Sequence, residues 1–217
     1  MSQLSATPNH DRAGNAPVSV EATDEDRREK RTDGLLVVPG ILTGHRRIIE
    51  AAEASLDSFV SHPTPRALAK RSVGRQAFRP EEHNNYEVDW VQVASHDAMS
   101  TELRDAVVES FAELGCDIRA RTFRLQRYRA GDYVLPHRDF VAQSLYVLTS
   151  SDRDGLVIEG DKRLRRIPDR SGTLVVIQPG VWHWVDPVLD PVRYTVAVSP
   201  PVIPEAVRPA TCPATRS

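Results

Sequence analysis

Residues 123–139, FRLQRYRAGDYVLPHRD, decide how the rest of the sequence is interpreted. The stretch ends in the tripeptide His137-Arg138-Asp139. Because successive side chains of an extended strand point to opposite faces, His137 and Asp139 are expected to project the same way and Arg138 the other way. An imidazole and a carboxylate would then lie side by side, where they could share a metal cation. A plain pair on a surface strand is the alternative.

A third ligand is available in a later strand-like segment. His183 lies 46 positions beyond His137, in the apolar run PGVWHWV. Two histidines and one carboxylate on one face of a metal, with the opposite face open, suit Fe(II) in non-haem oxygenases. The sequence therefore predicts that His137, Asp139 and His183 are metal ligands and the catalytic residues.

Composition limits the other classes of function. The chain has 217 residues, 40% of them hydrophobic and 27% charged, which is typical of one soluble domain with tails. A net charge of −2 gives no reason to expect nucleic acid as a partner, and no apolar run approaches the ~20 residues of a membrane span. With no hydrophobic leader, we expect a cytoplasmic protein without a membrane partner. The oligomeric state stays open.

The two cysteines, Cys116 and Cys212, do not form a CxxC pair. A disulfide and a cysteine-bound zinc are therefore not expected, and any metal must use histidine and carboxylate.

The chain is expected to divide into a disordered tail (1–33), a folded domain (34–203) and a loose C-terminal tail (204–217). Residues 1–33 contain few large apolar side chains and a dense charged run, so they cannot offset the entropy of ordering. Within the domain we expect a strand in LLVVP, a helix after Thr43 as its N-cap, and a strand over 86–95. A second helix should begin at the cap Ser100 and stop at Gly115. Between them, residues 60–80 form a basic, proline-punctuated loop, either solvated surface or a substrate-selecting loop.

From Thr122 onward the pattern changes to short strands separated by turn residues. Eight such segments follow one another: TFRLQRYR, YVLPHRD, SLYVLTS, DGLVIEG, KRLRRIP, GTLVVIQP, VWHWVDPV and VRYTVAVSP. Strands at this spacing indicate a mainly β fold with flanking helices, a jelly roll (double-stranded β-helix).

Arg193 lies on the final strand, where burial would leave its charge uncompensated unless it met an anion. A dicarboxylate could supply one through a bidentate, charge-assisted pair. Thr195, two residues on and therefore on the same face, can add a hydroxyl.

Over residues 123–199 the sequence resembles the Fe(II)- and 2-oxoglutarate-dependent oxygenases, and most closely their prolyl 4-hydroxylase-like branch. The resemblance is carried by LQRYRAGDYVLPHRD, by SLYVLTS leading to DGLVIEG, and by SGTLVVIQPGVWHWVDPV with the closing VRYTVAVS. It covers about a third of the chain with motifs, and the N-terminal strand and helix more loosely.

The resemblance implies the cofactors and the site. Fe(II) would be held by the triad, Arg193 would bind the 5-carboxylate of 2-oxoglutarate, and Thr195, Tyr128 and Tyr146 would be further cosubstrate contacts. O2 would be consumed to hydroxylate an unactivated C–H bond, with succinate and carbon dioxide released. The prolyl hydroxylases usually carry lysine where Arg193 stands, which weakens the case for a proline substrate. Since related halogenases lack the carboxylate ligand, Asp139 favours hydroxylation over halogenation, while desaturation and ring closure stay open.

The substrate is the open question. A small molecule, such as an amino acid or a biosynthetic intermediate, is favoured because the domain is compact. Candidate substrate contacts are Arg75, Arg79, Asn85, Tyr86 and Arg124, with Gln126 on the same strand face as Arg124. The alternatives are a peptidyl or protein hydroxylase and a non-catalytic, cupin-like metal- or ligand-binding module, although cupins ordinarily carry HxH where this sequence has HxD.

Overall fold

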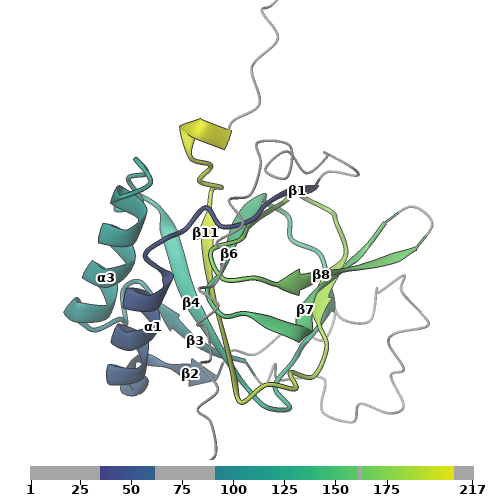
Figure 1. The fold of residues 1–217 in the computed structure, drawn as a ribbon, viewed down its shortest axis with the longest axis horizontal. Helices are drawn as coiled ribbons and strands as arrows, with labels where there is room; N and C mark the ends of the chain where they lie inside the picture. The colour runs from purple at the N-terminus through teal and green to yellow at the C-terminus, as the bar shows by residue number, and fades with distance from the viewer. Residues whose placement is uncertain (1–34, 62–90, 161–162, 208–217) are drawn as a thin grey trace, which may run out of the picture.

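The computed structural model describes residues 35–61, 91–160 and 163–207 (Figure 1). The sequence-based expectations for the N-terminal tail, for most of the basic segment 60–80, for residues 86–90 and for the last ten residues lie outside these ranges. So do four candidate substrate contacts, Arg75, Arg79, Asn85 and Tyr86.

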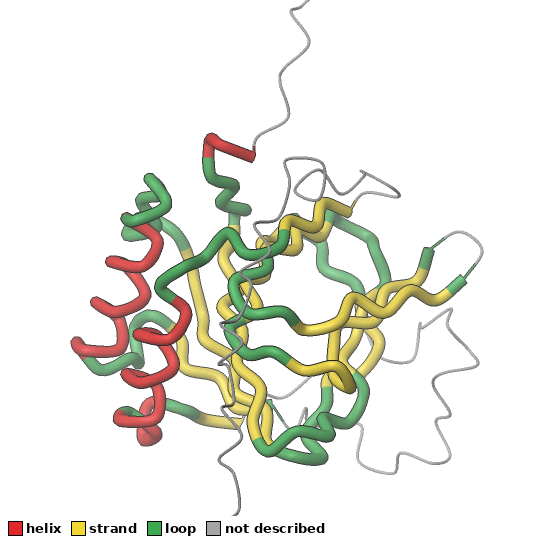
Figure 2. Tube along the Cα trace, in the orientation of Figure 1, coloured by secondary structure: helices red, strands yellow, loops and turns green. Residues whose placement is uncertain are grey.

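Two antiparallel sheets form the body of the protein (Figures 1 and 2). The larger sheet has seven strands in the order Leu35–Val38 (β1), Leu174–Ile177 (β9), Gln143–Val147 (β6), Val192–Ser199 (β11), Thr122–Arg129 (β4), Gln92–Ser95 (β3) and Val60–Ser61 (β2). The smaller sheet has four, in the order Val134–His137 (β5), His183–Val185 (β10), Ser151–Glu159 (β7) and Leu164–Asp169 (β8). The eight strands predicted after Thr122 are all confirmed, and so is the jelly-roll architecture.

The larger sheet has one face toward the helices and one toward the smaller sheet. Phe123 and Leu125 of β4 belong to a buried cluster that includes helix residues, whereas Tyr128 belongs to a second cluster with residues of the smaller sheet. This division follows from the period of two along a strand, which sends alternate side chains to opposite faces. The polar residues at positions 124 and 126 of β4 therefore share the inner face with Tyr128.

Both predicted helices are present and pack against the outer face of the larger sheet (Figure 1). They are His45–Ala54 (α1) and Thr101–Ala112 (α3); short 3₁₀ turns span Leu56–Ser58 and Glu205–Val207. Within the described residues, no helix is long and apolar enough to cross a membrane.

The helix ends confirm one predicted cap and correct another. The Ser100 side chain accepts a hydrogen bond from the Leu103 backbone N–H, and Gly115 has a φ of 69° just past the end of α3. The prediction that Thr43 caps α1 was wrong, because Gly44 occupies the N-cap and no side chain caps it. A Cβ at Gly44 would lie 2.4 Å from the Ser110 Oγ of α3, so the close approach of the two helices requires glycine there.

Replacing Ser100 with alanine should lower the free energy of unfolding by about 1–2 kcal/mol, because the cap of α3 is lost together with the 2.8 Å hydrogen bond between the Ser100 and Ser55 hydroxyls. Urea titration followed by circular dichroism measures the change. Thr101→Ala, at the exposed first position of the same helix, is the control and should leave the midpoint nearly unchanged. Equal effects of the two variants would contradict the capping role.

Candidate metal centre

The pairing of β5 with β10 brings the two histidines together. In this antiparallel pair, His137 and His183 are direct Cα partners, so their side chains emerge from neighbouring strands at the same level. Their ring centroids are 4.3 Å apart. Forty-six positions of chain are thus folded back so that the last residue of β5 faces the first residue of β10.

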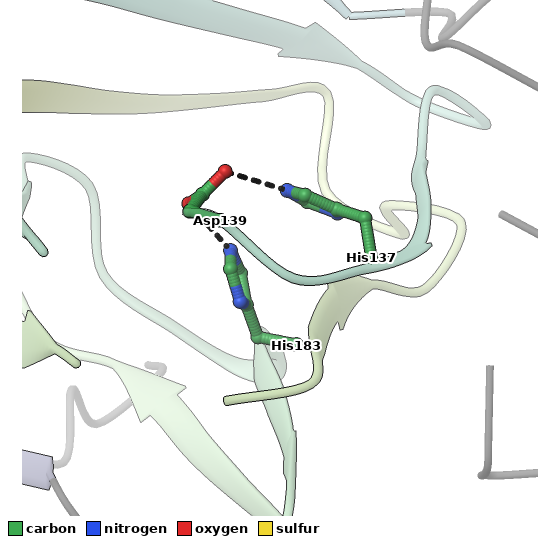
Figure 3. A group of neighbouring side chains, drawn as sticks. All are labelled: His137, Asp139 and His183. Atoms are coloured by element: carbon green, nitrogen blue, oxygen red, sulfur yellow. Dashed lines mark ion pairs between the residues drawn. The ribbon is translucent and has the colours of Figure 1, made fainter. Parts of the chain in front are cut away.

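Asp139 completes the group from the segment that follows β5 (Figure 3). One carboxylate oxygen lies 3.5 Å from the Nε2 of His183, and the other lies 4.0 Å from the Nε2 of His137. The three ligand atoms lie within 4.8 Å of one another. The structure therefore brings together the three residues that the sequence pattern predicts as metal ligands.

The backbone sets which imidazole nitrogen faces the carboxylate. The Nδ1 of His137 lies 2.8 Å from the Leu135 carbonyl oxygen, and the Nδ1 of His183 lies 3.0 Å from the Val181 carbonyl oxygen. Because a carbonyl can only accept, each Nδ1 must carry the proton and each Nε2 of a neutral ring offers a lone pair. Both lone pairs point toward Asp139, as a shared metal would require.

Burial keeps these rings neutral. It lowers the pKa of His137, and it lowers the pKa of His183 to about 4, with the neighbouring His137 and the positive charge of Arg124 contributing in the same direction. Near neutral pH both Nε2 atoms are therefore free of protons. A set of two neutral imidazoles and one carboxylate fits a divalent transition metal, and Fe(II) in particular.

Gln143 orients the carboxylate, and the sequence pattern did not predict this role. Its side-chain amide on β6 donates to the Oδ2 of Asp139, and the Gly180 backbone N–H donates to the Asp139 carbonyl oxygen at 3.0 Å. Partners of this kind fix the direction of a ligand. Gln143 lies only four positions after Asp139, but no motif marks the pair, because Asp139 lies in the irregular segment between β5 and β6.

Arg193 is buried, as expected, but its counter-charge comes from the chain itself. Its Nε and Nη2 donate to the two carboxylate oxygens of Asp169 on β8, at 2.6 and 3.0 Å, and both side chains are only 1% exposed. The expectation that a ligand anion must compensate the charge of Arg193 was therefore wrong. One donor remains, because the buried Nη1 has no hydrogen-bond partner within the described residues.

Polar side chains continue from Arg193 along the inner face of β4 and β11. Arg193 is the Cα partner of Tyr128, and its guanidinium lies 4.9 Å from the centroid of the Tyr128 ring. Thr195 is the partner of Gln126 and donates a 2.9 Å hydrogen bond to its side-chain oxygen. Arg124, opposite Ala197, continues the row. This polar strip lies within an otherwise apolar interior.

Tyr146 does not belong to this strip. It is fully buried in the cluster shared with the helices, its ring packs edge-on against Phe111 of α3 at 4.6 Å, and its hydroxyl donates to the Val202 carbonyl oxygen at 2.7 Å. The sequence-based assignment of Tyr146 as a cosubstrate contact is corrected for this reason: on β6 it points to the outer face, whereas Gln143 points inward.

The sequence matches no protein-family model and no curated protein. Solved structures do match. A prolyl hydroxylase from Trichoplax adhaerens, in complex with a hypoxia inducible factor peptide fragment, has a TM-score of 0.55 at 14% identity, covering 77% of this chain and 83% of that one. The non-haem alpha-ketoglutarate-dependent epimerase SnoN from nogalamycin biosynthesis has a TM-score of 0.51 at 13% identity, covering 77% of each chain. At these identities the likeness establishes the fold, the double-stranded β-helix that the sequence resemblance implied.

Replacing Asp169 with asparagine should lower the free energy of unfolding by about 3–5 kcal/mol, because it leaves the Arg193 charge buried without a counter-ion. The matched control is Asp152→Asn, which breaks the exposed ion pair with Arg170 and should change stability little. Urea unfolding of the two variants gives the comparison. If both were equally stable, Arg193 would have to be compensated in some other way.

The metal-free protein should lose stability as the pH falls from about 6.5 toward 4. In that window the unfolded chain binds protons at positions 137 and 183 that the folded chain excludes, since burial lowers the pKa of both rings. Thermal unfolding between pH 7 and pH 4 measures the loss. His183→Asn cannot bind the proton and should show a shallower pH dependence, and a dependence as steep as that of the wild type would contradict the assignment.

Proposed function

We propose that the protein is an Fe(II)- and 2-oxoglutarate-dependent dioxygenase that hydroxylates, or otherwise oxidises, an unactivated C–H bond of a small molecule. The observation that carries the proposal is the meeting of His137, Asp139 and His183, whose ligand atoms lie within 4.8 Å of one another on a double-stranded β-helix. Two neutral imidazoles and one carboxylate leave the remaining coordination positions open to a cosubstrate and to dioxygen.

When bound, the iron and 2-oxoglutarate supply the oxidising chemistry, in which one oxygen atom of O2 enters the substrate and the other enters succinate with release of carbon dioxide. The role of the chain is to hold and orient. His137 and His183 present Nε2 lone pairs because their Nδ1 protons are bonded to backbone carbonyls. Gln143 directs Asp139 through its Oδ2 and leaves Oδ1 free of that hydrogen bond.

The inner polar strip is the proposed position of the cosubstrate. The fully buried guanidinium of Arg193 retains one donor, Nη1, that has no hydrogen-bond partner among the described residues. A buried donor without a partner is costly, and a carboxylate oxygen would satisfy it. Thr195 and Tyr128 flank this guanidinium on the same face, so we propose that they contact the same end of the ligand. Asp169 would hold Arg193 in place through its bidentate pair.

A small-molecule substrate is proposed over a peptide. The described part of the chain consists of the two sheets and the helices that pack on them, without a second module that could hold a peptide. The two proteins similar in fold do not decide the question, since one is in complex with a peptide fragment and the other is from nogalamycin biosynthesis. A screen for succinate release across amino acids and other small carboxylic acids addresses the substrate directly.

Anaerobic titration with Fe(II) should produce a weak visible charge-transfer band only when 2-oxoglutarate is also present. His137→Ala or His183→Ala should abolish the band and iron-dependent succinate formation, because each variant removes one of three ligands. Arg193→Ala should instead raise the 2-oxoglutarate concentration needed. His45→Ala, a histidine outside the triad bonded to the Leu42 carbonyl oxygen, is the control.

Two results would count against this function. Absence of the band in the wild-type protein would favour a non-catalytic, cupin-like binding module. An unchanged 2-oxoglutarate requirement in Arg193→Ala would show that the cosubstrate is held elsewhere.

A further inference from the structure

Arg124 occupies a distinctive place in the inner polar strip. It lies on β4, with Ala197 of β11 and Ser95 of β3 as its Cα partners, and it shares the inner face with Gln126 and Tyr128. Tyr128, the partner of Arg193, lies four positions after Arg124, a distance of about 13 Å along a strand. The two inward-facing arginines therefore stand at opposite ends of the strip.

Among the described residues, the guanidinium of Arg124 has no counter-ion. Its Nε is buried and has no hydrogen-bond partner within the same part of the chain. The next arginine on the strand, Arg127, contrasts with it: on the outer face, it donates to the Tyr194 hydroxyl at 2.9 Å and to the Gln92 side chain at 2.8 Å. Leaving a buried charged donor unsatisfied is unfavourable, which points to a ligand that would pair with it.

Strand register places Arg124 at the end of the strip nearer the metal ligands. Its Cα partner on β11, Ala197, is also the partner of Leu145 on β6, two residues from the Gln143 that bonds Asp139. Asp169 neutralises Arg193, whereas Arg124 has no counter-ion among the described residues, and a divalent metal held by Asp139 would add further positive charge nearby. Both attract the same kind of ligand, an organic anion.

We propose that Arg124 is a carboxylate-binding residue beside the metal ligands, separate from the position at Arg193. The ligand of Arg124 is a carboxylate, which either an acidic substrate or the metal-proximal end of the cosubstrate can supply. The planar guanidinium favours a carboxylate because the two groups match in a bidentate pair. The inference deepens the proposed function and rests on it, but the binding step itself needs neither iron nor turnover.

The test measures binding to the full chain by thermal-shift titration, metal-free and loaded with Zn(II), which supports no oxidation. The probes are 2-oxoglutarate, succinate with and without saturating 2-oxoglutarate, and succinamide as the uncharged match of succinate. Arg124→Gln should weaken the binding of at least one carboxylate by about tenfold or more and leave the binding of succinamide unaffected. Arg124→Lys should retain only part of the carboxylate affinity, because the positive charge remains but the planar, bidentate donor geometry of the guanidinium is lost. Arg129→Gln, on the exposed end of β4, is the control.

Two arms identify the source of the carboxylate. Weakened 2-oxoglutarate binding with unchanged succinate binding assigns Arg124 to the cosubstrate, and weakened succinate binding in the presence of saturating 2-oxoglutarate assigns it to an acidic substrate. Carboxylate affinities within twofold of the wild type in Arg124→Gln would overturn the proposal. The failure of the proposed function would appear separately, as absent iron-dependent succinate formation with the Arg124-dependent binding intact.

Stability distinguishes a binding role from a structural one. Without ligand, Arg124→Gln should be at least as stable as the wild type, because it removes a buried donor that has no partner among the described residues. A structural arginine would behave in the opposite way. A clear loss of unliganded stability in Arg124→Gln would therefore overturn the proposal even if carboxylate binding also fell.

Discussion

The antiparallel pairing of β5 with β10 is the constraint on which the rest of the site depends. It makes His137 and His183 direct partners, and the backbone carbonyls two residues before each histidine fix the proton on Nδ1. A shift of one residue in this register would send one imidazole to the opposite face of the sheet. The arrangement of the three side chains therefore rests on the register of this strand pair.

The two arginines of the inner polar strip differ in how their charges are compensated. Arg193 and Asp169 neutralise each other at one end of the polar strip, whereas Arg124 at the other end has no counter-ion among the described residues. A buried ion pair contributes little net stability, but losing one partner is costly, so the first pair is a fixed structural feature. The unpaired charge is different, because the compensation proposed for it comes from a ligand. Arg124 would thus favour ligand binding and lower the stability of the unliganded protein.

Local patterns in the sequence predict much of the fold. The eight strands after Thr122 and the cap at Ser100 follow from alternation, turn residues and capping chemistry, which act over a few neighbouring residues. The assignment of Thr43 as a cap was wrong. Gly44 is the N-cap of α1, and its close contact with Ser110 of α3 leaves no room for a Cβ. That contact joins residues 66 positions apart, so no local pattern could show it.

HxD on a strand and one later histidine in an apolar run name the candidate donor set, so these three residues could be predicted from the sequence. The partners that surround them could not, because they follow from the fold. Asp169 meets Arg193, Gln143 meets Asp139, and Tyr146 turns to the helices, because each depends on which strands are neighbours and which face is inward. The two kinds of feature differ in range. Side-chain direction along a strand has a period of two and is local, whereas the partners of a buried charge come from the other sheet or from beyond the strand.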